Sequence, residues 1–108
     1  KMARKRMKAA AAAMKKRDSE AFYEEVLKAL WGYVSYKLNI DKAELNRDNI
    51  SEILQRKSVE EERIREFMNV LDTCEFARYA PGSNSEQEMD KVYKDGINVI
   101  TRLDKAIK

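Results

Sequence analysis

The sequence predicts an all-α protein, a compact bundle of about five helices. Charged residues make up 38% of the chain and the apolar class 44%, which is the balance of a folded protein with a solvated surface. Only three glycines and one proline interrupt the 108 residues, and apolar residues recur at intervals of three and four. This length is typical of a single domain with a modest core.

The first predicted helix covers residues 2–16. Ala3, Met7, Ala10 and Met14 recur on one side and form a narrow apolar stripe of small and flexible residues. The run of alanines favours a helix and permits close approach of a neighbouring element. We therefore expect residues 1–17 to form a basic first helix, and residues 18–108 to form the helical body of the same domain.

The second predicted helix covers residues 20–39 and is central to the fold. Asp18 or Ser19 is its expected N-cap. Apolar side chains occupy most of its circumference and leave one polar stripe: Glu20, Glu24, Lys28 and Ser35. A helix this apolar contacts several neighbours. With the first helix it resembles one helix pair of a tetratricopeptide-type repeat, although no second copy follows at a period of about 34 residues.

Three further helices are predicted. Residues 47–56 form a short helix after a connector in which Asp41 or Asn46 supplies a cap. The next helix begins at Ser58, where Glu61 completes a capping box, and it runs to about residue 80. The last helix begins after a second Ser–Glu box and carries an apolar seam with a heptad-like spacing: Met89, Val92, Tyr93, Gly96, Ile100, Leu103 and Ile107.

The run from Cys74 to Pro81 contains the most chemically suggestive side chains. Cys74 shares the apolar stripe of its helix, and the chain has no histidine to act as its base, so we expect a buried structural thiol. Arg78 lies in the last turn, where it can cover free carbonyls and pair with Glu75. The alternative for Arg78 is recognition of an external anion. Tyr79 and Pro81 are expected to pack the helix end against a neighbour.

No catalytic, metal or cofactor site is predicted. With one cysteine and no histidine, only a carboxylate site for a hard cation remains. Glu60, Glu61 and Glu62 are consecutive, so on a helix they point in different directions. The sequence contains no Gly-rich phosphate loop and no nucleophilic serine elbow. We expect a protein that is not an enzyme and that has no small-molecule substrate.

Trp31 is the leading candidate for contact with a partner protein. It falls in the polar stripe of the central helix, beside Leu27 and Leu38, and Tyr36 adds another aromatic ring on the same helix. An exposed tryptophan among apolar residues is a common anchor of protein interfaces. The alternative is that the first helix or the connector at residues 40–46 covers Trp31.

The amino-terminal segment is strongly basic. Residues 1–17 carry eight Lys or Arg and no acid, whereas the other 91 residues carry 14 basic and 19 acidic residues. Arg4, Lys5, Arg6 and Lys8 are therefore candidates for contact with an anionic membrane surface or with nucleic acid. The alternative is a solvated helix face. Nucleic acid is the less favoured partner because the acidic body would repel a duplex.

Three stretches together resemble the C-terminal helical domain of BatD, a family of bacterial aerotolerance proteins. They are AFYEEVLKALWGYVSYKLNI (21–40), LNRDNISEILQ (45–55) and FMNVLDTCEFARYAPG (67–82), and the run from residue 74 to 81 is the most specific. The similarity covers residues 8–107. The chain departs from the family pattern at Tyr36, at Asn46 where Ser or Thr is usual, and at Lys57 where Gly is expected.

This resemblance implies the soluble helical tail of a membrane-anchored protein that carries periplasmic β-domains before a transmembrane helix. It also implies partners among von Willebrand-type Bat membrane proteins and a MoxR-class ATPase, and a role in oxygen or stress tolerance. The basic start and the single free cysteine agree with a position at the cytoplasmic face of the bacterial inner membrane. We expect a protein–protein docking module, and the alternatives are a nucleic-acid-binding domain and a structural spacer beside the membrane.

Overall fold

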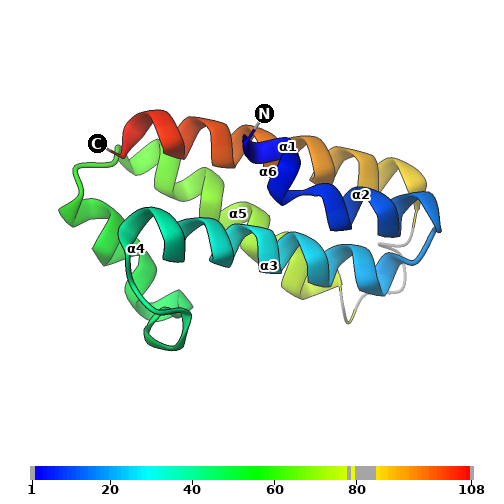
Figure 1. The fold of residues 1–108 in the computed structure, drawn as a ribbon, viewed down its shortest axis with the longest axis horizontal. Coiled ribbons are helices and arrows are strands. Elements are labelled where there is room, and N and C mark those ends of the chain that lie inside the picture. The colour runs from blue at the N-terminus through cyan, green and yellow to red at the C-terminus, as the bar shows by residue number, and fades with distance from the viewer. Residues whose placement is uncertain (1, 78, 80–84, 108) are drawn as a thin grey trace.

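The computed structural model describes residues 2–77, 79 and 85–107, and in these residues all of the regular secondary structure is helical (Figure 1). No strand occurs in this part of the chain. The elements are α1 (Met2–Arg6), α2 (Lys8–Lys15), α3 (Ser19–Leu38), the short 3₁₀-helix η1 (Lys42–Glu44), α4 (Arg47–Arg56), α5 (Glu61–Ala77) and α6 (Glu86–Ala106). The predicted all-α class is confirmed.

The helix α3 is central, as predicted, because it packs against α2, α5 and α6. Figure 1 shows α2 and α3 as an antiparallel pair, with α5 and α6 as a second antiparallel pair beside it. The short helix α4 branches from one end of the bundle and contacts α5. Within the described residues, no helix has the length and apolarity that a bilayer crossing requires.

Local side-chain caps explain where the central helices begin and end. The Asp18 carboxylate accepts a hydrogen bond of 3.1 Å from the Ala21 N–H at the start of α3. Asn39 ends α3 in the left-handed conformation, with φ 58°. At the start of α4, Asn46 and Asn49 each accept a 3.0 Å hydrogen bond from the other's backbone N–H, which is a reciprocal capping box.

The start of α5 differs from the prediction. Ser58 does not cap this helix but instead ends α4, because it adopts a left-handed conformation with φ 65°. Its N–H donates to the Gln55 carbonyl at 3.0 Å, and the N–H of Val59 donates to the Leu54 carbonyl at 3.1 Å. These two bonds make a Schellman motif, and Val59 is buried as its apolar partner. The predicted capping box of Ser58 is therefore wrong, since the same residue serves the preceding helix.

The predicted first helix is also divided, at Met7, into α1 and α2. The hydrogen bonds from Met7 N to Ala3 O and from Ala11 N to Met7 O, at 3.1 and 2.9 Å, still link the two pieces. The Met7 side chain is fully buried and lies over Gly96 of α6. A Cβ atom at Gly96 would lie 2.7 Å from Met7 Cε, so the glycine permits the close approach of the amino-terminal segment to α6.

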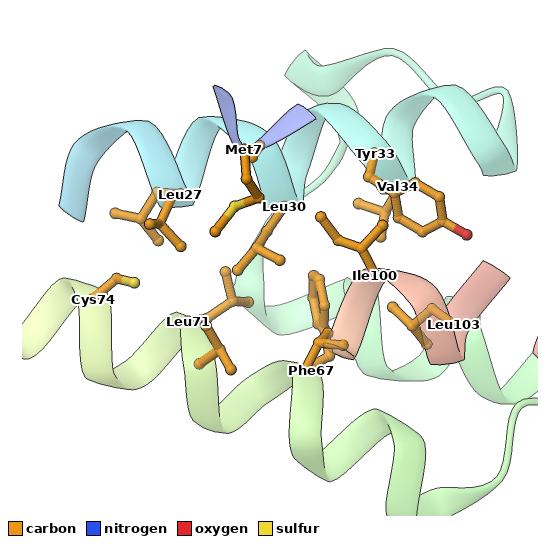
Figure 2. Packing of buried hydrophobic residues seen from close by; sticks show 14 of the residues in the cluster. Met7, Leu27, Leu30, Tyr33, Val34, Phe67, Leu71, Cys74, Ile100 and Leu103 are labelled. Atoms are coloured by element: carbon orange, nitrogen blue, oxygen red, sulfur yellow. The ribbon is translucent and has the colours of Figure 1, made fainter. Parts of the chain in front are cut away.

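The core lies between α3, α5 and α6, and the amino-terminal segment completes it. Figure 2 shows side chains from these elements converging around Leu30, Phe67, Leu71 and Ile100, with Met7 above them. Each of these five side chains is fully buried. Burial of this apolar surface is the main favourable contribution to folding.

Candidate functional site

Cys74 is a core residue, as predicted. Its side chain is fully buried, and Figure 2 shows it pointing from α5 towards α3. Burial, and secondly the nearby Glu75 carboxylate, raises the pKa of the Cys74 thiol to about 12. A thiol with so high a pKa is protonated at neutral pH and is a poor nucleophile, so Cys74 acts as a small apolar side chain.

Glu75 pairs with an arginine from another helix. Its Oε1 atom lies 3.6 Å from Nη1 of Arg47, and the same guanidinium also pairs with Asp72. Arg78, the predicted partner of Glu75, and Pro81 lie outside the described residues. The ion pairs of Glu75 and Asp72 join the start of α4 to α5 and are partly exposed, so they contribute little to stability.

Tyr79 does not pack against a neighbouring element. Its side chain is 83% exposed, and Phe76 nearby is 70% exposed, so the predicted packing of Tyr79 is wrong. The Tyr79 N–H donates a 3.0 Å hydrogen bond to the Phe76 carbonyl, which places both rings on one turn. Cys74 and Ala77, close to Phe76 in α5, are buried, so the exposed Phe76 ring lies on the other side of that helix.

Phe76 was not among the predicted site residues, although the sequence contained a signal for it. It is two positions from Cys74, which on a helix places it nearly opposite the apolar stripe that holds Cys74. A large aromatic residue opposite the buried stripe of its helix does not pack in the core. This pattern distinguishes Phe76 from Phe67, which lies within the stripe and is fully buried.

Trp31 is half-buried and packs against α5. Its ring meets the Phe67 ring edge to face, with centroids 6.1 Å apart and an interplanar angle of 88°. Leu27 and Leu38, which were expected to flank an exposed tryptophan, are both buried, so that predicted surface is wrong. The reason is that α5 packs on this side of α3. Of the candidate partner contacts on this helix, Tyr36 is the exposed one, with 73% of its surface accessible.

The basic segment divides into exposed and packed side chains. Arg4, Lys5 and Lys8 are exposed, which is compatible with contact to an anionic surface. Arg6 instead is half-buried, and its guanidinium carbon lies 5.2 Å from the ring centre of Tyr36 and 5.9 Å from that of Tyr33. Arg6 is therefore held against α3 by cation–π contacts and is not a free surface charge.

A groove of about 410 Å³ runs between α5 and α6 and was not predicted. Val70, Val92 and Val99 form its buried floor. Charged pairs line its walls, including Glu66 with Arg102 and Lys91 with Asp95, each at 2.9 Å. Its residues are far apart in sequence, so no local motif indicates it. In the described part of the chain, no group of His, Cys, Asp and Glu is arranged to hold a metal ion.

The structure thus places the predicted site residues apart from one another. Cys74 is a core residue, Trp31 makes an internal contact between α3 and α5, Tyr36 and Tyr79 are exposed near the ends of α3 and α5, and Arg4, Lys5 and Lys8 are exposed on the amino-terminal segment. No protein-family model, curated protein or solved structure matches the chain. The resemblance to BatD and to a tetratricopeptide-type pair therefore stays a prediction from the quoted residues.

Proposed function

We propose that the chain is a non-catalytic protein–protein interaction module, the cytoplasmic helical tail of a BatD-like membrane-anchored aerotolerance protein. Its proposed partners are von Willebrand-type Bat membrane proteins or a MoxR-class ATPase. The observation that supports this proposal is the exposure of Phe76 and Tyr79 on one turn, inside the sequence run that carries the resemblance.

The two rings are well suited to contact a partner. Aromatic side chains bury a large apolar area at a small cost in side-chain entropy, and tyrosine is enriched among the residues that dominate interface energies. Cys74 and Ala77, on either side of Phe76 in α5, are buried in the core, so the Phe76 ring projects from a fixed support. Preorganisation of this kind lowers the entropic cost of binding.

Titration of the purified chain with the soluble domains of the proposed partners tests this function. The double variant Phe76→Ala/Tyr79→Ala should raise the Kd about 30-fold or more, the effect of losing a dominant interface contact. Both side chains are exposed, so the variant should unfold at the same temperature as the wild type. Equal binding by the variant and the wild type would show that this turn is not the surface.

Tyr36→Ala is the matched comparison, because this ring is similarly exposed but lies on the last turn of α3. Figure 1 places that helix end and the end of α5 at opposite ends of the bundle. We expect Tyr36→Ala to leave partner binding unchanged. If neither partner bound the chain in this titration, the docking function would be contradicted and the structural spacer would remain as the alternative. Tight binding of a random duplex at physiological salt, through Arg4, Lys5 and Lys8, would favour the nucleic-acid alternative.

A further inference from the structure

The outer side of the amino-terminal segment carries only basic and alanine side chains. Its exposed residues recur at helical intervals of three and four, and we call them the basic face: Arg4, Lys5, Lys8, Ala9, Ala12, Lys15 and Lys16. The buried residues of the segment follow the same spacing on the other side: Ala3, Met7, Ala10 and Ala13. That buried side packs on α3 and α6, so the basic face is turned outward by the fold itself.

The described residues do not neutralise the basic face. No ion pair joins any of its five cations to an acid in that part of the chain. Glu86 and Asp90, at the start of α6, line a surface hollow together with Lys15. These two acids are already engaged, Glu86 by Arg17 at 3.9 Å and Asp90 by Lys94 at 3.0 Å. The basic face therefore keeps five positive charges without a counter-charge from the protein.

The solvated sides of the other helices have a different composition, because they pair bases with acids one turn away. These pairs are Arg56–Glu52 on α4, Arg65–Glu61 on α5, and Lys91–Asp95 and Lys94–Asp90 on α6. The basic face instead places Arg4 and Lys8, with the same charge, four residues apart, and α1 has no acid in its first turn. Like charges at this spacing and cations near the amino end both destabilise a helix. A surface that breaks local rules without a compensating internal contact is expected to have a binding role.

We propose that the basic face lies against the surface of an anionic phospholipid bilayer. Each Lys or Arg near such a surface strengthens binding about fivefold. The five cations are spread along about 20 Å of helix, and a bilayer supplies many anions over that length in one plane. The alanines between them let the helix approach the headgroups closely. No large apolar side chain is exposed among the described residues of the segment, so the contact is electrostatic and does not insert into the bilayer.

A nucleic-acid duplex is the other polyanion that five cations could attract. Proteins that recognise nucleic acid add amide, hydroxyl or aromatic side chains to their phosphate contacts, in order to read or stack the bases. The basic face has none of these groups and offers charge alone. Charge alone is sufficient for a bilayer surface, which is therefore the favoured partner.

This contact also orients the proposed docking surface. Figure 2 shows Met7, on the buried side of the segment, at one side of the core, and α5 at the other. With the basic face on the bilayer, α5 lies on the far side of the core. The exposed Phe76 ring then faces the aqueous phase, where a soluble partner domain approaches. The lipid contact stands independently of the proposed docking function, and only this orientation rests on it.

Co-sedimentation of the full chain with phosphatidylcholine vesicles, with and without phosphatidylserine, tests the lipid contact. We expect binding that requires phosphatidylserine and that is lost in high salt, because salt screens exposed charges. A random DNA duplex is titrated at the same salt. In nuclear magnetic resonance spectra with a paramagnetic headgroup lipid, the amide signals of Ala9 and Ala12 should broaden more than that of Phe76.

Two double variants make the test specific to the basic face. Arg4→Gln/Lys8→Gln removes two of its cations, and Arg56→Gln/Lys57→Gln makes the same change of charge at the exposed end of α4. We expect about a 25-fold loss of vesicle binding in the first variant and less than a twofold change in the second. The first variant should unfold at the wild-type temperature or above it, because like charges on one helix are removed.

Several outcomes would overturn the proposal. An equal loss in the two variants would mean attraction to net charge alone, and equal binding to both kinds of vesicle would exclude an anionic partner. Absence of vesicle binding, or tighter binding of the duplex, would also refute the bilayer contact. Equal broadening of all three amide signals would refute the orientation. Partner binding by Arg4→Gln/Lys8→Gln without vesicles should equal that of the wild type, so failure here is distinguishable from failure of the docking function.

Discussion

The close contact between Met7 and Gly96 provides a test of the fold. The effect of Gly96→Ala on the free energy of unfolding should change sign when Met7 is replaced by alanine. The new Cβ would lie 2.7 Å from Met7 Cε and 3.5 Å from its sulfur. Met7 is fully buried and cannot turn into solvent, so it must repack. Overpacking of this kind costs about 1–3 kcal/mol. Replacing a helical glycine by alanine gains about 1 kcal/mol.

In the wild-type background the two effects oppose each other, and we expect a net destabilisation of about 1 kcal/mol. With Met7→Ala the clash is absent, and the same change should stabilise the protein by about 1 kcal/mol. The coupling between the two sites is then about 2 kcal/mol, within the range for residues in contact. Met7→Ala alone should cost about 2–5 kcal/mol, which a domain with a stability of about 5–15 kcal/mol can tolerate.

Urea unfolding of the wild type, the two single variants and the double variant, followed by circular dichroism, measures this cycle. Gly32→Ala is the control for helix propensity, because its Cβ meets no atom closer than 3.5 Å. It should stabilise the protein in both backgrounds. If Gly96→Ala changed the free energy of unfolding by the same amount and in the same direction with and without Met7, the amino-terminal segment would not pack on α6 at this point.

Three further predictions follow from the core, a cap and a buried thiol. Phe67→Ala should lower the free energy of unfolding by about 3–5 kcal/mol and shift Trp31 emission to longer wavelength, as measured by urea unfolding and fluorescence. Asn46→Ala should cost about 1 kcal/mol in the same unfolding assay, because it removes the capping box of α4. Burial, and then Glu75, raises the pKa of Cys74 from 9.0 to about 12, so its contribution to stability is complete below pH 9 and is lost as pH rises towards 12. Unfolding measured across this range should show a weaker pH dependence in Cys74→Ala; the dependence that remains comes from buried tyrosines, whose pKa values are also raised.

Most of the helical architecture was predictable from local sequence. The bounds of α3 and α4 agree with the prediction to within one residue, because their caps and apolar faces depend on residues that are near in sequence. The structural role of Cys74 was predictable for the same reason, since it shares a stripe with Phe67 and Leu71. Ser58 shows the limit of local rules, because its position suits both a helix start and a helix end.

The candidate surfaces depended on tertiary packing. The sequence alone could not show that α5 covers Trp31, that Arg6 lies on two tyrosine rings, or that Lys42 approaches Gly32. Each of these contacts joins residues from different elements. The caps and helical periodicity are decided by hydrogen bonds and side chains within about four residues, so the sequence by itself determined the helices. Which side of each helix meets another helix, and which side meets solvent, depends on how all the helices share one core, and only the tertiary structure decided that.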